Sequence, residues 1–141
     1  MARRNYNGVQ INPAPTIVEM AGAAIDDCRN RIMKYDENGK VVLAAAGTDI
    51  PLGIAIIEAG YNDITGLEAG KVAVGDDVDI QIKDMGVVIA SADIKKGQEI
   101  AAGADGLAAV AASGDYVLGL AITDAKANGF LHIAINKYQK A

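Results

Sequence analysis

The chain contains one eighteen-residue pattern twice: VLAAAGTDIPLGIAIIEA at Val42–Ala59 and AAVAASGDYVLGLAITDA at Ala108–Ala125. Eight of the eighteen positions are identical. Each copy has a small apolar run, a polar turn with an aspartate, and then Leu-Gly followed by alternating large and small apolar residues. That alternation is typical of a strand with one crowded face. Two copies are too few for a solenoid, so we expect two similar corners in one compact fold. The residues that define these corners are Asp49, Leu52, Gly53, Asp115, Leu118 and Gly119.

The rest of the chain also has the pattern of short strands and turns. Valine and isoleucine hold even parity from Val72 to Ile82, which predicts a half-buried strand. Asn38-Gly39 favours the positive φ angles of a tight hairpin turn. Residues 83–86 are interpreted as a turn that leads this strand back into Val87–Ile89, and Phe130–Ile135 as the closing strand.

Turn residues roughly every 8–12 positions predict a mainly β fold, either a small β-barrel or a sandwich. We expect one domain over residues 16–141. Residues 1–15 are expected to be an extended N-terminal arm, because Pro13 and Pro15 cannot donate backbone hydrogen bonds and favour extended geometry. A disordered terminus is the alternative for this segment.

Composition argues against several classes of function. The net charge of −5 disfavours a general nucleic-acid binder, and no apolar run approaches the roughly 18 residues of a membrane span. The one cysteine excludes an intrachain disulfide, and His132 is interpreted as an ordinary strand side chain. Asp77 and Asp79 would share a strand face that could bind Ca²⁺ weakly, although a solvated face is favoured. With no catalytic motif, we expect a non-enzyme without cofactor or metal.

Much of the chain resembles a family of phage capsid cement, or head-decoration, proteins. The resemblance covers Ala21 to Ile135 and is carried by AGAAI at 21–25, RIMKYD at 31–36, NGKV at 38–41, PLGIA at 51–55, GKVAVGD at 70–76, IKKG at 94–97 and LGLA at 118–121.

The resemblance implies a β-rich structural protein of the virion that binds the outer surface of an expanded tailed-phage capsid. Its implied partners are the major capsid protein and two further copies of itself in a homotrimer, with assembly in the bacterial cytoplasm. It implies no cofactor and no catalytic residue. The alternatives are a head-fibre or receptor- or glycan-binding domain displayed on the capsid, and an enzyme-associated β module.

Two further expectations come from the residues themselves. An apolar fraction of 51% in a small chain favours a closed homo-oligomer that covers the surplus apolar surface. The arm combines a basic end with apolar anchors, and such a segment could add a strand to the edge of a capsid protein. The candidate capsid-binding residues of the arm are Arg3, Arg4, Tyr6, Val9 and Ile11.

Overall fold

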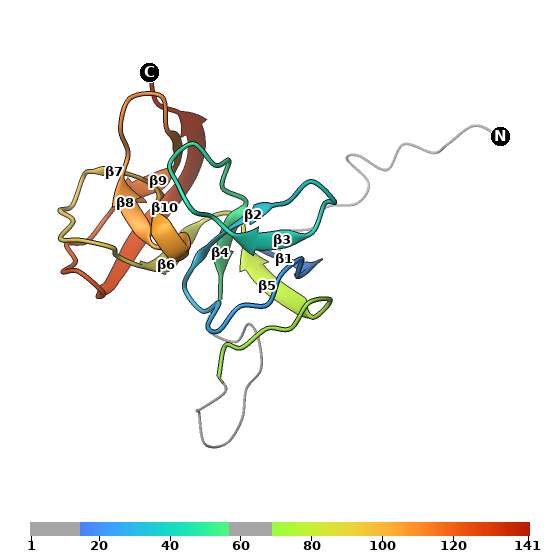
Figure 1. Ribbon diagram of the computed structural model, residues 1–141. Coiled ribbons are helices and arrows are strands. Elements are labelled where there is room, and N and C mark those ends of the chain that lie inside the picture. Colours follow the sequence, from blue (N-terminus) through green and yellow to red (C-terminus); the bar gives the residue numbers. More distant parts are fainter. Residues whose placement is uncertain (1–14, 57–68) are drawn as a thin grey trace, which may run out of the picture.

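The computed structural model describes residues 15–56 and 69–141, and it contains two five-stranded antiparallel sheets (Figure 1). The first sheet has the order β1-β5-β4-β2-β3 and the second has the order β6-β10-β9-β7-β8. The strands of the first sheet are β1 (Thr16–Met20), β2 (Ile32–Tyr35), β3 (Val41–Leu43), β4 (Gly53–Ala55) and β5 (Asp77–Gln81). Those of the second are β6 (Met85–Ile89), β7 (Glu99–Ala102), β8 (Ala108–Val110), β9 (Tyr116–Ala121) and β10 (Phe130–Gln139), with a 3₁₀ turn at Ala104–Gly106.

The prediction of a mainly β fold is confirmed, in its sandwich-like form and not as a barrel. Each sheet curls until its two edge strands meet at a single parallel bridge, Ala21 with Val41 in the first sheet and Ala90 with Ala108 in the second. The two corners of the repeat therefore lie in two separate sheets. The sequence predicts an arm over residues 1–15 and one domain from residue 16. Of the arm, residues 1–14 lie outside the described residues.

The two sheets are structural copies of one another. Each strand from β6 to β10 takes the place that β1 to β5 take in the first sheet. The pairing register is also the same, since Val18 lies opposite Asp79 and Val87 lies opposite His132. We call residues 15–56 and 69–82 the first half and residues 85–141 the second half.

Each half curls around its own apolar core, built from equivalent positions. These residues are buried, and each fully buried aliphatic side chain stabilises the fold by roughly 1.5–3 kcal/mol. The shared positions of the first half are Ala21, Ile25, Met33, Val41, Ala55, Val78 and Ile80. Those of the second half are Ala90, Ile94, Ile100, Ala108, Ala121, Leu131 and Ile133.

Aspartate turns recur between the strands. The carboxylates of Asp49, Asp76 and Asp115 each accept a hydrogen bond from the backbone N–H of the residue three positions earlier. The backbone N–H of each aspartate donates in return to the carbonyl of that earlier residue. Gly75 and Gly114 precede two of these aspartates with φ angles of 91° and 87°, which glycine adopts without strain. The Gly75-Asp76 and Gly114-Asp115 pairs therefore mark the turns that lead directly into β5 and β9.

The chain crosses between the halves where the sequence pattern predicted a hairpin. β5 and β6 belong to different sheets and do not pair, so the interpretation of residues 83–86 as a returning turn is wrong. Asp84 has a φ angle of 69° and redirects the chain into the second half. The Asn38-Gly39 hairpin does form between β2 and β3, but only Gly39 of the two has a positive φ.

Candidate binding surfaces at the junction of the two halves

The second half packs onto the outer face of the first sheet. Ile32 and Ile54 point away from the first core and are buried in the core of the second half. Gly86 of β6 leaves the space that Ile54 fills, because a Cβ at this glycine would lie 2.8 Å from the Ile54 Cδ1. The junction is thus an interior contact between two units of the same fold.

Backbone groups add to this contact. The Ile89 N–H donates to the Asn30 carbonyl at 3.0 Å, and the Asn30 side-chain amide donates to the Val87 carbonyl at 3.0 Å. The Gly106 N–H donates to the Ala44 carbonyl at 2.7 Å. Asn30 thereby covers the outer edge of β6, which would otherwise expose unpaired backbone groups.

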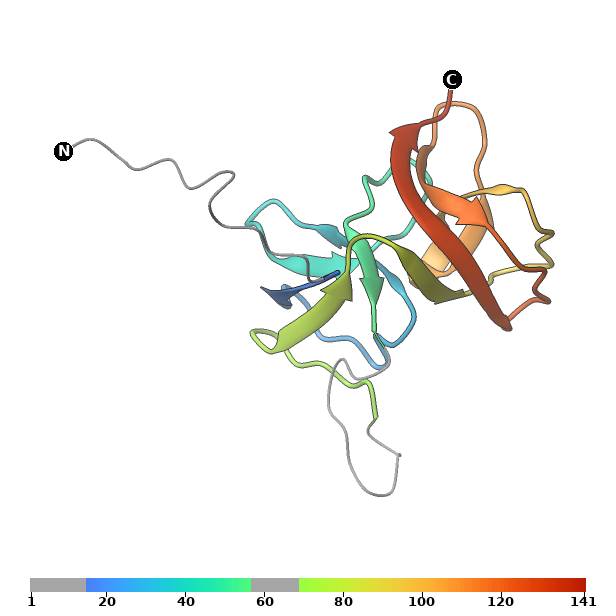
Figure 2. The same ribbon diagram turned by 180° about the vertical axis from the view of Figure 1, so that it is seen from behind.

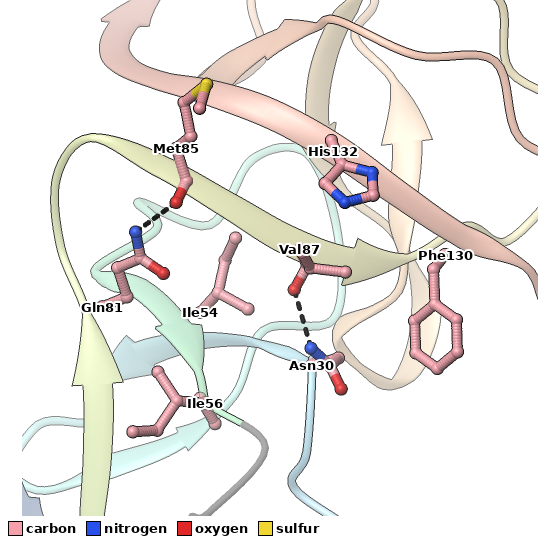
Figure 3. A pocket seen from close by; sticks show the side chains of 9 residues that line it. Asn30, Ile54, Ile56, Gln81, Met85, Val87, Phe130 and His132 are labelled. Carbon is pink, nitrogen blue, oxygen red and sulfur yellow. Dashed lines mark hydrogen bonds between the residues drawn. The ribbon is translucent and has the colours of Figure 1, made fainter.

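A groove of about 490 Å³ opens beside the junction, between β4 and β5 of the first half and β6 and β10 of the second (Figure 3). Gln81 and Met85 lie at one end and Phe130 at the other, with His132 above and Ile56 below. Met85 and Phe130 are 67% and 61% exposed. Two large apolar side chains at the rim of a mostly apolar groove suit the docking of an apolar side chain from a partner.

The groove is poorly equipped for catalysis. His132 is the only titratable group among the described residues that line it. Nothing in the lining supplies a nucleophile held by a base, which covalent catalysis requires. Its chemistry is therefore that of a binding site for apolar groups.

Other candidate groups lie apart from the groove. Asp77 and Asp79 are on β5, opposite Met20 and Val18. Within residues 15–56 and 69–141, no group of three or more His, Cys, Asp or Glu side chains could hold a metal ion. Cys28 is a buried free thiol, and burial together with the neighbouring Asp27 charge raises its pKa to about 11. No helix in the described residues is long and apolar enough to span a membrane.

The turns of the two corners touch each other, although they belong to different sheets. The Tyr116 N–H donates to the Gly47 carbonyl at 2.8 Å. Gly53 and Gly119 occupy equivalent positions in β4 and β9, each pressed against the neighbouring strand. Leu118 is buried at the junction, while the Leu52 carbonyl accepts a hydrogen bond from the Lys137 ammonium.

The two corner aspartates differ in their partners. Lys34 forms an ion pair with Asp49 at 2.8 Å, whereas Asp115 accepts only from the backbone among the described contacts. Burial acts to raise the pKa of Asp49, but hydrogen bonds from Lys34, Ala45 and Ala46 outweigh it and lower the pKa.

Replacing Asp49 with Asn should therefore lower stability most near neutral pH, by about 1–2 kcal/mol. A carboxyl with a lowered folded pKa stabilises the fold above its unfolded value of about 3.9, and this contribution is lost as pH falls through the folded pKa. Urea unfolding of Asp49→Asn and wild type between pH 7 and pH 3 should show the gap closing in acid. Asp115→Asn is the control without a lysine partner, and a gap that stays constant down to pH 3 would contradict the assignment.

Comparison with known proteins establishes the fold. No known family profile matches the sequence, and no curated protein matches it. The chain is similar to a solved structure described as the crystal structure of the head fiber gp8.5 N base in bacteriophage phi29. The two share a fold. The TM-score is 0.64 at 22% identity, and the match covers 89% of this chain and 97% of that chain.

The sequence patterns predict the two corners but do not predict the groove. The sequence patterns predict strands at residues 54–56 and 130–132 but no binding role for any groove residue. One signal was present, because Phe130 and His132 are two positions apart in a strand and must share a face. The arm residues Arg3, Arg4, Tyr6, Val9 and Ile11 lie outside the described residues.

Proposed function

We propose that this chain is a non-enzymatic structural protein of a tailed-phage virion that binds the outer surface of the capsid. The observation that carries the proposal is the shared fold with a head-fibre base, which extends over nearly all of both chains. The resemblance to capsid decoration proteins supports the same location from different residues. In this proposal the partners are the major capsid protein and further copies of this chain in a closed trimer.

Two roles on the capsid fit this location. A cement protein stabilises the shell itself, whereas a head-fibre base mainly anchors an appendage. The similarity to the phi29 structure favours the second role. Comparing the heat resistance of capsids with and without the bound protein separates the two, because only a cement raises the temperature at which the shell opens.

Attachment is proposed to use the basic arm. Exposed ion pairs contribute only about 0–1 kcal/mol each, so Arg3 and Arg4 add little to the affinity of the arm for the capsid. Most of that affinity must come from backbone hydrogen bonds and from the apolar anchors Tyr6, Val9 and Ile11. The arm leaves the first half at Pro15, whose carbonyl accepts from the Ile82 N–H at 2.8 Å.

A variant that begins at Thr16 tests this attachment. It should melt near the full-length temperature, keep its oligomeric state by light scattering, and co-sediment much more weakly with capsids that lack the protein. Unfolding of the variant would assign the arm to the fold. Undiminished co-sedimentation would place attachment elsewhere on the protein, and failure of the full-length chain to co-sediment would overturn the proposed function.

A further inference from the structure

The edge of β6 that does not pair with β10 is covered by a residue of the first half. The Ala90 N–H donates to Gly129 and the Ile135 N–H donates to Asp84, which fixes the residues of β6 that pair with β10. By alternation, Val87 and Ile89 direct their backbone groups toward the other edge. There Asn30 of the first half bonds both of them.

The equivalent edge of β1 has the same pattern and lacks this cover. The Ala21 N–H donates to Asp76 and the Ile82 N–H donates to Pro15, so Thr16, Val18 and Met20 direct their backbone groups away from β5. The parallel bridge of Ala21 with Val41 closes the Met20 end of this edge, and among the described residues no side chain covers Val18 as Asn30 covers Val87. Val18 and Met20 are 55% and 45% exposed. β1 lies at the outer edge of the first sheet, beside β5 (Figures 1 and 2).

A second copy of the chain could cover this edge only with its second half, in the way that the first half covers β6. The residues of the second half at the equivalent positions are poorly suited to that contact. The position equivalent to Asn30 is Gly97, which keeps the positive φ but has no amide side chain. Glu99 stands where Ile32 lies in the first half, and it forms an ion pair with Lys140 at 3.2 Å. Of the two apolar junction positions, the second half keeps only Leu120 in the place of Ile54, so its outer face does not repeat the apolar junction.

We propose that an extended, basic segment of the capsid protein pairs with the free edge of β1. The segment would form backbone hydrogen bonds with Thr16 and Val18, on the part of the edge that lies beyond the Ala21–Val41 bridge, as peptides do when they add a strand to a sheet. The side chains of Asp77 and Asp79 lie on the same face as Met20 and Val18, their cross-strand partners. These carboxylates form no ion pair with a described residue, so they favour lysine or arginine in the segment. This inference rests on the proposed function and names the element that makes the contact.

Val18→Pro is the sharpest test. The Val18 N–H faces the free edge, so proline removes a donor to the partner without removing a bond to β5, and edge strands tolerate proline there. The variant should unfold at nearly the wild-type temperature and bind capsids lacking the protein at least about tenfold more weakly. Val18→Thr keeps the N–H and the branched shape, and it should bind within about threefold of wild type.

A second variant covers the case in which Val18→Pro does not fold. The pair Asp77→Lys and Asp79→Lys reverses the exposed charge and should weaken capsid binding by a similar factor. The control pair Asp26→Lys and Glu37→Lys makes the same change in net charge at exposed positions outside the β1 edge and should bind as wild type does.

The outcomes separate the two proposals. Wild-type protein that fails to bind capsids overturns the proposed function. Wild-type protein that binds, together with full binding by both Val18→Pro and the Asp77/Asp79 pair, overturns only the β1 contact. Loss of the oligomer in Val18→Pro with capsid binding unchanged would assign the edge to a second copy and also overturn it.

Discussion

Replacing Gly53 or Gly119 with valine should destabilise the protein by about 3 kcal/mol, the upper part of the range for overpacking. A Cβ at Gly53 would lie 2.1 Å from the Gln81 carbonyl oxygen, and one at Gly119 would lie 2.2 Å from the Ala134 carbonyl oxygen. Both obstacles are backbone atoms of the neighbouring strand, so the added atoms cannot be accommodated by a change of rotamer. The free energy of unfolding in urea, measured for both variants, checks the prediction.

The two glycines should also behave alike, because they occupy equivalent positions in the two sheets. Gly103→Ala is a suitable control in extended backbone, since its new Cβ would lie 3.2 Å from the Ala109 Cβ and that contact can relax. Its cost should be clearly smaller. Near-zero effects at both Gly53 and Gly119 would contradict the close approach of the strands.

The junction gives the second large effect. Ile54→Asp should cost about 3–5 kcal/mol, because it buries a carboxyl without a partner and removes an apolar side chain that is 1% exposed. Circular dichroism melts and urea unfolding measure the loss. We expect one cooperative transition for the wild type and two separate transitions for the variant, because the two halves would no longer stabilise each other.

The internal duplication supplies a matched control. Leu120 occupies the position of Ile54 in the second half, where it is 43% exposed and has no half packed on it. Leu120→Asp should therefore change stability by no more than about 0.5 kcal/mol. Equal losses for Ile54→Asp and Leu120→Asp would show that the junction contributes little beyond local packing.

The sequence repeat revealed only the middle of the duplication. Gly53 and Gly119 could be matched because close strand packing demands glycine at both places. β1 and β6 could not be matched, since the first has a Glu19 where the second has the buried Val88. The sequence repeat aligns Val42 with Ala108, which would pair Val41 with Leu107. In the structure Val41 of β3 takes the place of Ala108 in β8, so the two alignments differ by one residue there.

The crossing and the groove depend on tertiary structure that local patterns do not encode. A Lys-Asp turn with a positive φ suits a hairpin and a crossing equally well, and only the burial of Ile32 and Ile54 decides between them. The groove exists because that crossing places β6 and β10 beside β4 and β5. Its residues come from both halves, so no contiguous motif could identify it.

The link between the halves determines how the molecule bears mechanical load. Only Ile82, Lys83 and Asp84 separate β5 from β6, and the chain between Ile82 and Met85 can span at most about 10 Å. A force applied between the first half and Ala141 can therefore extend this link very little. Any larger extension requires a strand to separate from its sheet. β10 leads to that terminus, and it pairs with β6 over residues 130–134 and with β9 between Ile133 and Gln139 (Figure 2). Under tension, the two halves should therefore stay at a nearly fixed separation.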